Sequence, residues 1–144
     1  MNGGYLILMA DDDNEDKLLM KHAFEESKLS ATLEFVEDGV ELFEYLEKRL
    51  STGRLPSIIL LDLNMPRMGG KEVLQKIKAH NLLKKIPVII FSTSSLGADI
   101  EHCYEIGASS YITKPSLYSH LVIIAKSISK YWFESVNLPL LSIQ

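Results

Sequence analysis

Cysteine is almost absent from this sequence, and its scarcity excludes two classes of small protein. The single Cys103 cannot form an internal disulfide, so the fold has to be held by its hydrophobic core. The four histidines, His22, His80, His102 and His120, do not have the spacing of a zinc site. We therefore expect neither a disulfide-stapled domain nor a zinc-binding one.

Long apolar runs and an excess of positive charge are also missing. No stretch reaches the ~18 residues of a membrane-spanning helix, and no basic region precedes the short apolar stretch at the N-terminus. With 15 Lys and Arg against 19 Asp and Glu, the net charge of −4 gives no general electrostatic reason to bind nucleic acid. We expect a cytoplasmic protein that binds neither membranes nor nucleic acid.

Short apolar runs alternate with segments of helical periodicity along the 144 residues, which suffice for one domain. The runs cover residues 5–10, 31–36, 57–62, 87–92 and 109–113. Alternating strands and helices with short connections predict a parallel sheet with helices on both faces. The expected fold class is α/β: a doubly wound, five-stranded parallel sheet with five helices.

Each expected helix has an apolar stripe, although the stripe of the fourth, near 96–106, is weak. The stripes are Leu19, Met20, Ala23 and Phe24 in the first; Leu42, Phe43, Leu46 and Leu50 in the second; Val73, Leu74 and Ile77 in the third; and Leu117, Leu121, Ile124, Ile128 and Tyr131 in the last. We expect the last helix to run from about Ser116 to Phe133.

Polar residues stand at the carboxyl ends of four expected strands. They are Asp11, Asp12 and Asp13 after the first, Asp62 after the third, Ser92 and Thr93 at the end of the fourth, and Lys114 after the fifth. In an open α/β sheet the binding crevice lies outside these ends. If the strand order is 2-1-3-4-5, the four strands adjoin, and these side chains converge on one pocket.

Asp62 ends the apolar run "IILLD", where an unpaired carboxylate would be costly. Two or three carboxylates within ~4 Å also repel by roughly 4 kcal/mol per pair at an effective dielectric near 20. A cation removes both penalties, and a ligand set made only of oxygen suits Mg²⁺. The strand ends therefore predict a magnesium site that includes Asp62.

Each of these features also has an ordinary explanation. Acidic clusters such as "DDDNED" are often solvated helix N-termini, where negative charge interacts favourably with the helix dipole. A lone hydroxyl at a strand end is often a turn or a cap, and Lys-Pro often precedes a helix. Four strands that end in the parts of one metal and phosphate site nevertheless favour a functional site.

Five stretches occur in an order that resembles the response-regulator receiver domain of two-component signalling. They are "ILMADDDNED", "EDGVELFEYL", "ILLDLNMPRMGG", "IPVIIFSTSS" and "GASSYITKP", and they extend over nearly the whole chain. The resemblance implies a flavodoxin-like fold with strand order 2-1-3-4-5. It further implies a partnership with a sensor histidine kinase and output through protein contact.

The resemblance implies roles for eight positions. Asp62 is the phosphoacceptor, Asp12 the direct metal ligand, Asp11 the second acidic residue, the Asn64 backbone carbonyl a further ligand, Lys114 the phosphate-pairing lysine, Ser92 the switch hydroxyl, Tyr111 the switch aromatic, and Pro115 the residue after a cis peptide bond. The implied reaction transfers a phosphoryl group from phosphohistidine to Asp62, with Mg²⁺ and Lys114 neutralising charge. Such a protein is a signalling switch with weak intrinsic chemistry, not an enzyme.

Within the family, the chain is most similar to small single-domain regulators that partner bacteriophytochrome-type histidine kinases. The similar features are the loop "EKRLSTGRLPS" before the third strand and the tail "YWFESVNLP" after the last helix. We expect one receiver domain over 1–144, with a core of about 4–133, a tail over 134–144 and no output domain.

Two positions depart from the family pattern. Gly69 stands where many relatives have aspartate, which removes a capping side chain and puts the stiffness of the loop after Asp62 in doubt. Thr93 stands where Ala or Gly is common, and its larger side chain narrows access to the phosphoryl group.

Two other functions are compatible with parts of this pattern. A pseudo-receiver would keep the fold without phosphorylation, but degenerate receivers commonly lose one of the residues that are intact here. A dehalogenase-type phosphohydrolase would use an Asp-x-Asp pair after the first strand, which Asp11 and Asp13 supply, but the chain has no room for its cap.

The C-terminal segment has more apolar residues than one helix stripe can bury. Beyond the stripe come Tyr131, Trp132, Phe133, Val136, Leu138, Leu140 and Leu141. Because aromatic residues are favoured at interface centres, we expect Tyr131, Trp132 and Phe133 to take part in a homodimer. The alternative is that the tail folds back over the domain's own core.

Overall fold

The computed structural model describes residues 4–28 and 31–139, which form a three-layer α/β domain. The parallel strands are β1 (Tyr5–Ala10), β2 (Ala31–Val36), β3 (Ile58–Leu61), β4 (Val88–Ser92) and β5 (Ser110–Thr113). Their order in the sheet is β2-β1-β3-β4-β5. The predicted fold class and strand order are confirmed.

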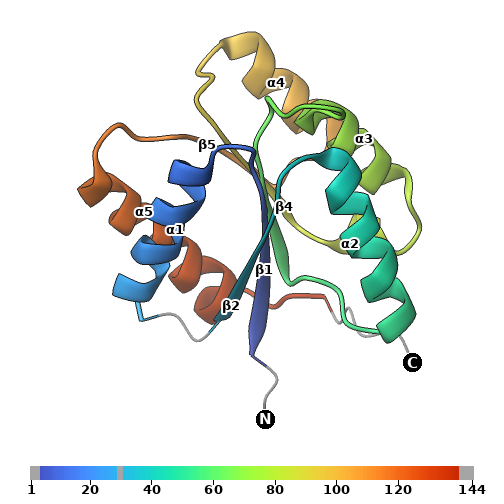
Figure 1. Cartoon of the computed structure of the whole chain (residues 1–144), viewed down its shortest axis with the longest axis horizontal. Coiled ribbons are helices and arrows are strands. Elements are labelled where there is room, and N and C mark those ends of the chain that lie inside the picture. Colours follow the sequence, from blue (N-terminus) through green and yellow to red (C-terminus); the bar gives the residue numbers. More distant parts are fainter. Residues whose placement is uncertain (1–3, 29–30, 140–144) are drawn as a thin grey trace.

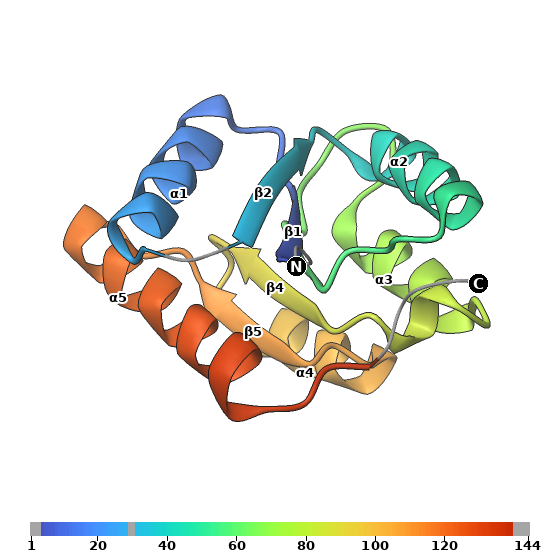
Figure 2. The same cartoon turned by 90° about the horizontal axis from the view of Figure 1, so that it is seen from below.

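Five α-helices in the described residues cover the two faces of this sheet (Figures 1 and 2). They are α1 (Asn14–Glu26), α2 (Gly39–Thr52), α3 (Gly70–Ala79), α4 (Gly97–Ile106) and α5 (Tyr118–Lys130). Helices α1 and α5 lie together on one face, and α2, α3 and α4 lie on the other (Figure 2). No helix of the described residues combines the length and apolar character of a membrane span.

The strand register brings the carboxyl ends of β1 and β3 together. Ala10 pairs with Leu61, and the Asp62 N–H donates to the Ala10 carbonyl at 3.0 Å. On the other side of β3, the Lys114 N–H donates to the Ser92 carbonyl at 2.8 Å. The ladder thus places the residues that follow β1, β3 and β5 at one edge of the sheet, which is the upper edge in Figure 1.

The members of the predicted apolar stripes are buried or partly buried, except for three that are exposed. Leu19 is exposed on α1, because the sheet-facing side of that helix is formed by Met20, Ala23 and Phe24. Leu117 is exposed because it precedes α5 as its N-cap residue and does not belong to the helix.

The exposure of the third member, Tyr131, is explained by the way α5 ends. A π-helical turn over Tyr131–Ser135 succeeds the helix and carries an extra residue per turn. The spacing of three and four residues therefore breaks down, and Tyr131 is 54% exposed.

The chain after α5 packs back onto the core, which is the arrangement weighed as the alternative to a dimer contact. Trp132, Phe133 and Leu138 are partly buried against the core between the sheet and helices α1 and α5. The Phe133 ring stacks on Tyr5, with centroids 4.2 Å apart. Only Tyr131 of the three residues expected at an interface points outward, and the homodimer stays a prediction.

Gly70 allows helix α3 to begin directly against the backbone at the end of β3. A Cβ at this position would lie 2.2 Å from the Asp62 carbonyl oxygen and 2.8 Å from Leu63 Cα. The Gly70 N–H donates to the Leu63 carbonyl at 2.9 Å. Any side chain here must therefore push α3 away from the end of β3.

We predict that Gly70→Ala lowers the free energy of unfolding by about 1–3 kcal/mol, the usual cost of forcing atoms into a packed site. Gly97→Ala is the matched control, because Gly97 starts α4 and has no neighbouring atom within 4 Å of an added Cβ. Urea titrations of both variants measure the difference. Equal stabilities would show that the backbone contact at Gly70 is not restrictive.

Candidate functional site

Three aspartates meet at the carboxyl edge of the sheet. Asp11 is fully buried and Asp62 is 6% exposed, whereas Asp12 is exposed. One carboxylate oxygen from each of the three lies within 4.8 Å of the others. Asp13 does not belong to this group, because its side chain caps α1 by accepting the Asp16 N–H at 3.0 Å. The structure thus brings together the predicted trio and separates it from the neighbouring aspartate.

Burial makes it costly to ionise both inner carboxylates. It raises the pKa of Asp62 to about 6, although Lys114 and the backbone N–H groups of Asn64 and Leu63 act in the opposite direction. Burial also raises the pKa of Asp11. A divalent cation would offset both the desolvation and the mutual repulsion. The oxygen-only donor set therefore fits a hard cation such as Mg²⁺.

The Lys114 ammonium supplies positive charge beside the aspartates. Its Nζ lies 2.7 Å from Asp11 Oδ2, 2.7 Å from Asp16 Oδ2 and 3.7 Å from Asp62 Oδ2. Burial works against its charge, but the hydrogen bonds to Asp11 and Asp16 raise the pKa of Lys114 overall. The position of Lys114 agrees with the sequence prediction, whereas the contact with Asp16 was not predicted, because its sequence pattern is only that of an acidic helix N-terminus.

Ser92 and Tyr111, the predicted switch pair, are joined through Ser94. The Ser92 side chain is fully buried, and its Oγ accepts the Ser94 N–H at 3.3 Å. The half-buried Tyr111 donates its hydroxyl proton to the Ser94 carbonyl at 2.8 Å. Both residues therefore hold the same segment after β4. Thr93, which lies between Ser92 and Ser94, is exposed to solvent.

The Ser94 segment is further tied to helices α3 and α4. The Ser94 hydroxyl donates to Asp99 at 2.6 Å, and the Lys71 ammonium donates to the other oxygen of Asp99, also at 2.6 Å. These two hydrogen bonds hold the pKa of Asp99 below its ordinary value. Ser94 and its partners were not predicted, because no local sequence pattern links residues on three separate elements.

The loop after Asp62 is held by an ion pair from another loop. Asp38 accepts hydrogen bonds from Arg67 Nε at 2.7 Å and Nη2 at 3.1 Å, and it also caps α2 through the Glu41 N–H. The Gly39 N–H donates to the Met68 carbonyl at 3.1 Å. The loop is thus fixed, although Arg67 has a left-handed backbone with φ of 61°.

Gly69 acts as the N-cap residue of α3 and, as expected, provides no capping side chain. The loop after Asp62 is therefore held by contacts outside the helix cap, namely the Arg67–Asp38 ion pair and the hydrogen bond from Gly39 to Met68. The ion pair between Arg67 and Asp38 was not predicted from the sequence, because the two residues lie 29 positions apart.

One predicted feature of the site is wrong. The structure contains no cis peptide bond in its described residues, so Lys114 and Pro115 are joined by a trans bond. The trans isomer is the favoured form of an X–Pro bond, and from it the Lys114 side chain reaches Asp11 and Asp16. Asn64 is exposed beside the site, and the role of its carbonyl stays a prediction.

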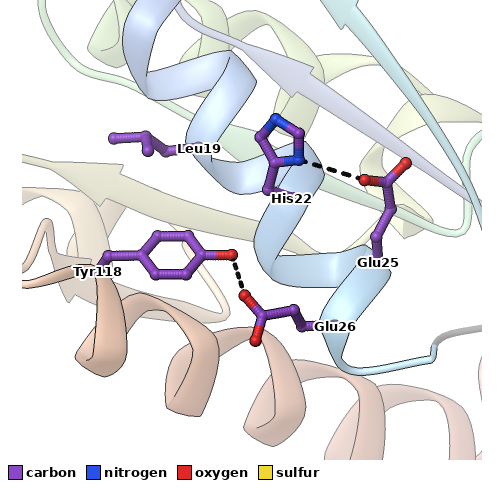
Figure 3. Close-up of a pocket in the computed structure, with 5 residues that line it drawn as sticks. All are labelled: Leu19, His22, Glu25, Glu26 and Tyr118. Carbon is purple, nitrogen blue, oxygen red and sulfur yellow. Dashed lines mark hydrogen bonds and ion pairs between the residues drawn. The ribbon is translucent and has the colours of Figure 1, made fainter.

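A cavity lies directly beside Lys114, between the start of α1 and the segment that leads into α5. It is lined by Asp16, Leu19, Phe91, Lys114, Pro115, Ser116, Leu117, Tyr118 and Leu121. Leu19 and Tyr118 also line an open groove between α1 and α5 (Figure 3). In that groove Tyr118 donates to Glu26, and His22 lies 3.4 Å from Glu25. The cavity beside Lys114 and the groove between α1 and α5 therefore share two lining residues, Leu19 and Tyr118.

The sequence and the fold both match known proteins. The response regulator receiver domain family matches residues 7–126. This chain belongs to the response regulator receiver family. Receivers accept phosphoryl groups from histidine kinases and act as signalling switches, and the predicted family and function are confirmed at that level.

Two curated receivers illustrate the similarity in sequence. The probable methanogenesis regulatory protein FilR2 of Methanothrix harundinacea is 34% identical over 129 residues, or 89% of this chain and 83% of FilR2. Response regulator Rcp1 of Synechocystis sp. is 32% identical over 136 residues, or 93% of this chain and 92% of Rcp1.

Two crystal structures agree with this receiver fold. The phosphorylated cyanobacterial phytochrome response regulator RcpA aligns with a TM-score of 0.88 and 36% identity, and the alignment covers 96% of this chain and all of RcpA. The Mn²⁺-bound form of Rcp1 aligns with a TM-score of 0.85 and 32% identity over 94% of this chain and 99% of Rcp1.

The ion pair between Arg67 and Asp38, beside the loop after Asp62, leads to a pH-dependent prediction. Arg67 and the Glu41 N–H hold the pKa of Asp38 below its ordinary value of 3.8. The stabilisation that Asp38 provides is therefore complete above pH 3.8 and is lost as the pH falls through the lower pKa of the folded state. Asp38→Asn keeps a capping side chain but loses the charge. It should destabilise the protein at neutral pH, by an amount that shrinks in acid.

Urea unfolding of the parent and of Asp38→Asn, at neutral pH and in acid, measures this effect. Asp13→Asn is the matched control, since Asp13 caps α1 by the same type of bond but has no arginine hydrogen bond in the described part of the chain. A stability difference for Asp38→Asn that does not change with pH would contradict the ion-pair explanation.

Proposed function

We propose that this receiver accepts a phosphoryl group on Asp62 in a Mg²⁺-dependent reaction and signals through contact with another protein. The observation that supports this most directly is the juxtaposition of Asp62 with two further aspartates and a buried lysine. These groups follow three strands of the sheet: Asp11 and Asp12 follow β1, Asp62 follows β3, and Lys114 follows β5. The arrangement provides a nucleophile, a cation site and a fixed positive charge within a few ångströms.

Asp11, Asp12 and Asp62 would hold the cation, with the Asn64 backbone carbonyl as a further ligand. A mixed set of carboxylate and carbonyl oxygens suits Mg²⁺, which retains water and takes a phosphate oxygen as well. The relative Rcp1 has a Mn²⁺-bound form, which supports a divalent cation in this pocket. Bound there, Mg²⁺ would neutralise part of the charge on the transferring phosphoryl group.

The chain's own residues account for the transfer. A carboxylate oxygen of Asp62 forms a bond to the phosphorus of a phosphohistidine as the P–N bond breaks, and the electron pair of that bond remains on the imidazole nitrogen. The Lys114 ammonium, 3.7 Å from Asp62, pairs with the phosphoryl oxygens. Water later hydrolyses the acyl phosphate, so the protein is a switch with weak intrinsic chemistry and not an enzyme with a separate substrate.

The signal would leave the site through Ser92 and Tyr111. A phosphoryl oxygen on Asp62 is a new acceptor for the Ser92 hydroxyl, whose Oγ accepts the Ser94 N–H in this structure. Movement of Ser92 changes the Ser94 segment, and with it the hydrogen bond that holds Tyr111. Phosphorylation would therefore shift the surface around α4 and β5 between two arrangements.

A phytochrome-type sensor histidine kinase is the proposed phosphoryl donor, because RcpA is a phytochrome response regulator and this chain covers all of it. The proposal includes a cytoplasmic location, where such a kinase would present its phosphohistidine. It also includes a homodimer to which the exposed Tyr131 contributes. Trp132 and Phe133, which are partly buried against the core of their own chain, would hold Tyr131 in position for that contact.

The first test of this function concerns the phosphoacceptor. Treatment with acetyl phosphate and Mg²⁺ should give one phosphoryl adduct, and Asp62→Asn should abolish it because the amide is not a nucleophile. Intact-protein and peptide mass spectrometry detects the adduct. Chelation of the metal should suppress labelling of the parent, and labelling of Asp62→Asn at the parent rate would move the acceptor elsewhere.

The second test concerns the switch. Ser92→Ala should still be phosphorylated but should lose most of the structural change, because it has no hydroxyl to donate to the phosphoryl group. The shift of Tyr111 backbone and ring resonances on phosphorylation, followed by NMR, measures the change. Thr93→Ala is the control, since Thr93 is the neighbouring hydroxyl and is exposed. A full Tyr111 shift in Ser92→Ala would disprove the coupling.

A further inference from the structure

The Lys114 ammonium has two close carboxylate partners, and one of them has no role in the function proposed above. That partner is Asp16, whose Oδ2 lies 2.7 Å from Nζ, as close as Asp11 and closer than Asp62 at 3.7 Å. The Lys114 side chain is only 9% exposed, so these contacts are made largely out of water. Hydrogen bonds between ionised groups in such surroundings are short and strong. Asp16 thus fixes Lys114 as closely as Asp11 does.

The position of Asp16 is set by the start of α1. Its backbone N–H donates to Asp13 Oδ1 at 3.0 Å, which anchors the first helical turn. The favourable interaction of an acidic residue with the helix dipole explains why this turn contains Glu15 and Asp16. It does not explain the direction of the Asp16 carboxylate, which turns inward to Lys114 while the Glu15 side chain stays exposed.

Asp16 also lies outside the group of carboxylates that fits a cation. In the part of the chain that the structure describes, that group consists of Asp11, Asp12 and Asp62. Asp11 would therefore have to serve both a cation and the Lys114 ammonium, which repel each other. Asp16 is the partner of Lys114 that has no such second task.

We propose that Asp16 is a positioning residue that holds the Lys114 ammonium beside Asp62. An ammonium has three N–H donors, so two can bond to Asp11 and Asp16 while the third remains for an oxygen on Asp62. Asp16 acts only through Lys114 and does not touch the phosphoryl group. This inference rests on the proposed roles of Asp62 and Lys114 and adds the residue that keeps the lysine in place.

Binding of beryllofluoride, an inorganic phosphoryl mimic, in the presence of Mg²⁺ tests the proposal. Asp16→Asn should weaken that affinity roughly tenfold, the scale of one charge-assisted hydrogen bond. Asp16→Glu, which retains the charge, should restore part of it. Glu15→Gln is the matched control, because it removes one negative charge from the same helical turn, and it should change the affinity by less than about twofold.

A double-mutant cycle distinguishes positioning of Lys114 from a general effect of charge or folding. In a Lys114→Gln background, Asp16→Asn should have no further effect on beryllofluoride affinity or on the rate of labelling by acetyl phosphate. A persistent effect in that background would overturn the proposal. So would an Asp16→Asn variant that binds beryllofluoride as tightly as Glu15→Gln, or more tightly than the parent, because Asp16 would then compete for the lysine.

The same measurements separate this inference from the proposed function. If the parent protein forms no adduct on Asp62, the phosphoacceptor assignment itself is wrong. If the parent is labelled on Asp62 and Asp16→Asn behaves like the Glu15→Gln control, only the role of Asp16 is wrong.

Discussion

Two buried carboxylates on neighbouring parallel strands are the constraint on which the rest of this structure depends. The pairing of Ala10 with Leu61 forces Asp11 and Asp62 to emerge side by side, and both are almost fully excluded from water. Their burial makes full ionisation costly without nearby positive charge. The Lys114 ammonium, which follows β5, supplies part of that positive charge. The three aspartates carry more negative charge than one lysine neutralises, which favours a divalent cation. The juxtaposition of the two carboxylates thus follows directly from the strand register.

The surrounding loops keep this unfavourable cluster of charge in one geometry. Gly70 lets α3 start in contact with the backbone of Asp62, and the Arg67–Asp38 ion pair fixes the chain between them. Beyond β4, Ser94 joins three elements through its N–H, hydroxyl and carbonyl groups. None of these residues belongs to the acidic pocket. They limit how far its members can move apart.

The residues at the strand ends could be predicted because two local signals coincide there. Period-two and apolar patterns define where a strand stops, and a charged residue at that point, such as Asp62 or Lys114, has to lie at the crevice. Contacts between elements have no such signal. The ion pair of Arg67 spans 29 residues, and the inward turn of Asp16 depends on how α1 sits relative to β5. Tyr131 was misplaced because the sequence does not show that α5 ends in a wider turn.

The stacking of Tyr5 on Phe133 joins the first strand to the turn that follows the last helix, across 128 residues of sequence. During synthesis, β1 is made first, yet the aromatic ring at its start has no partner until almost the whole domain has been translated. The contact therefore depends on a long-range encounter between β1 and the segment after α5, and contacts of such high sequence separation form slowly in folding.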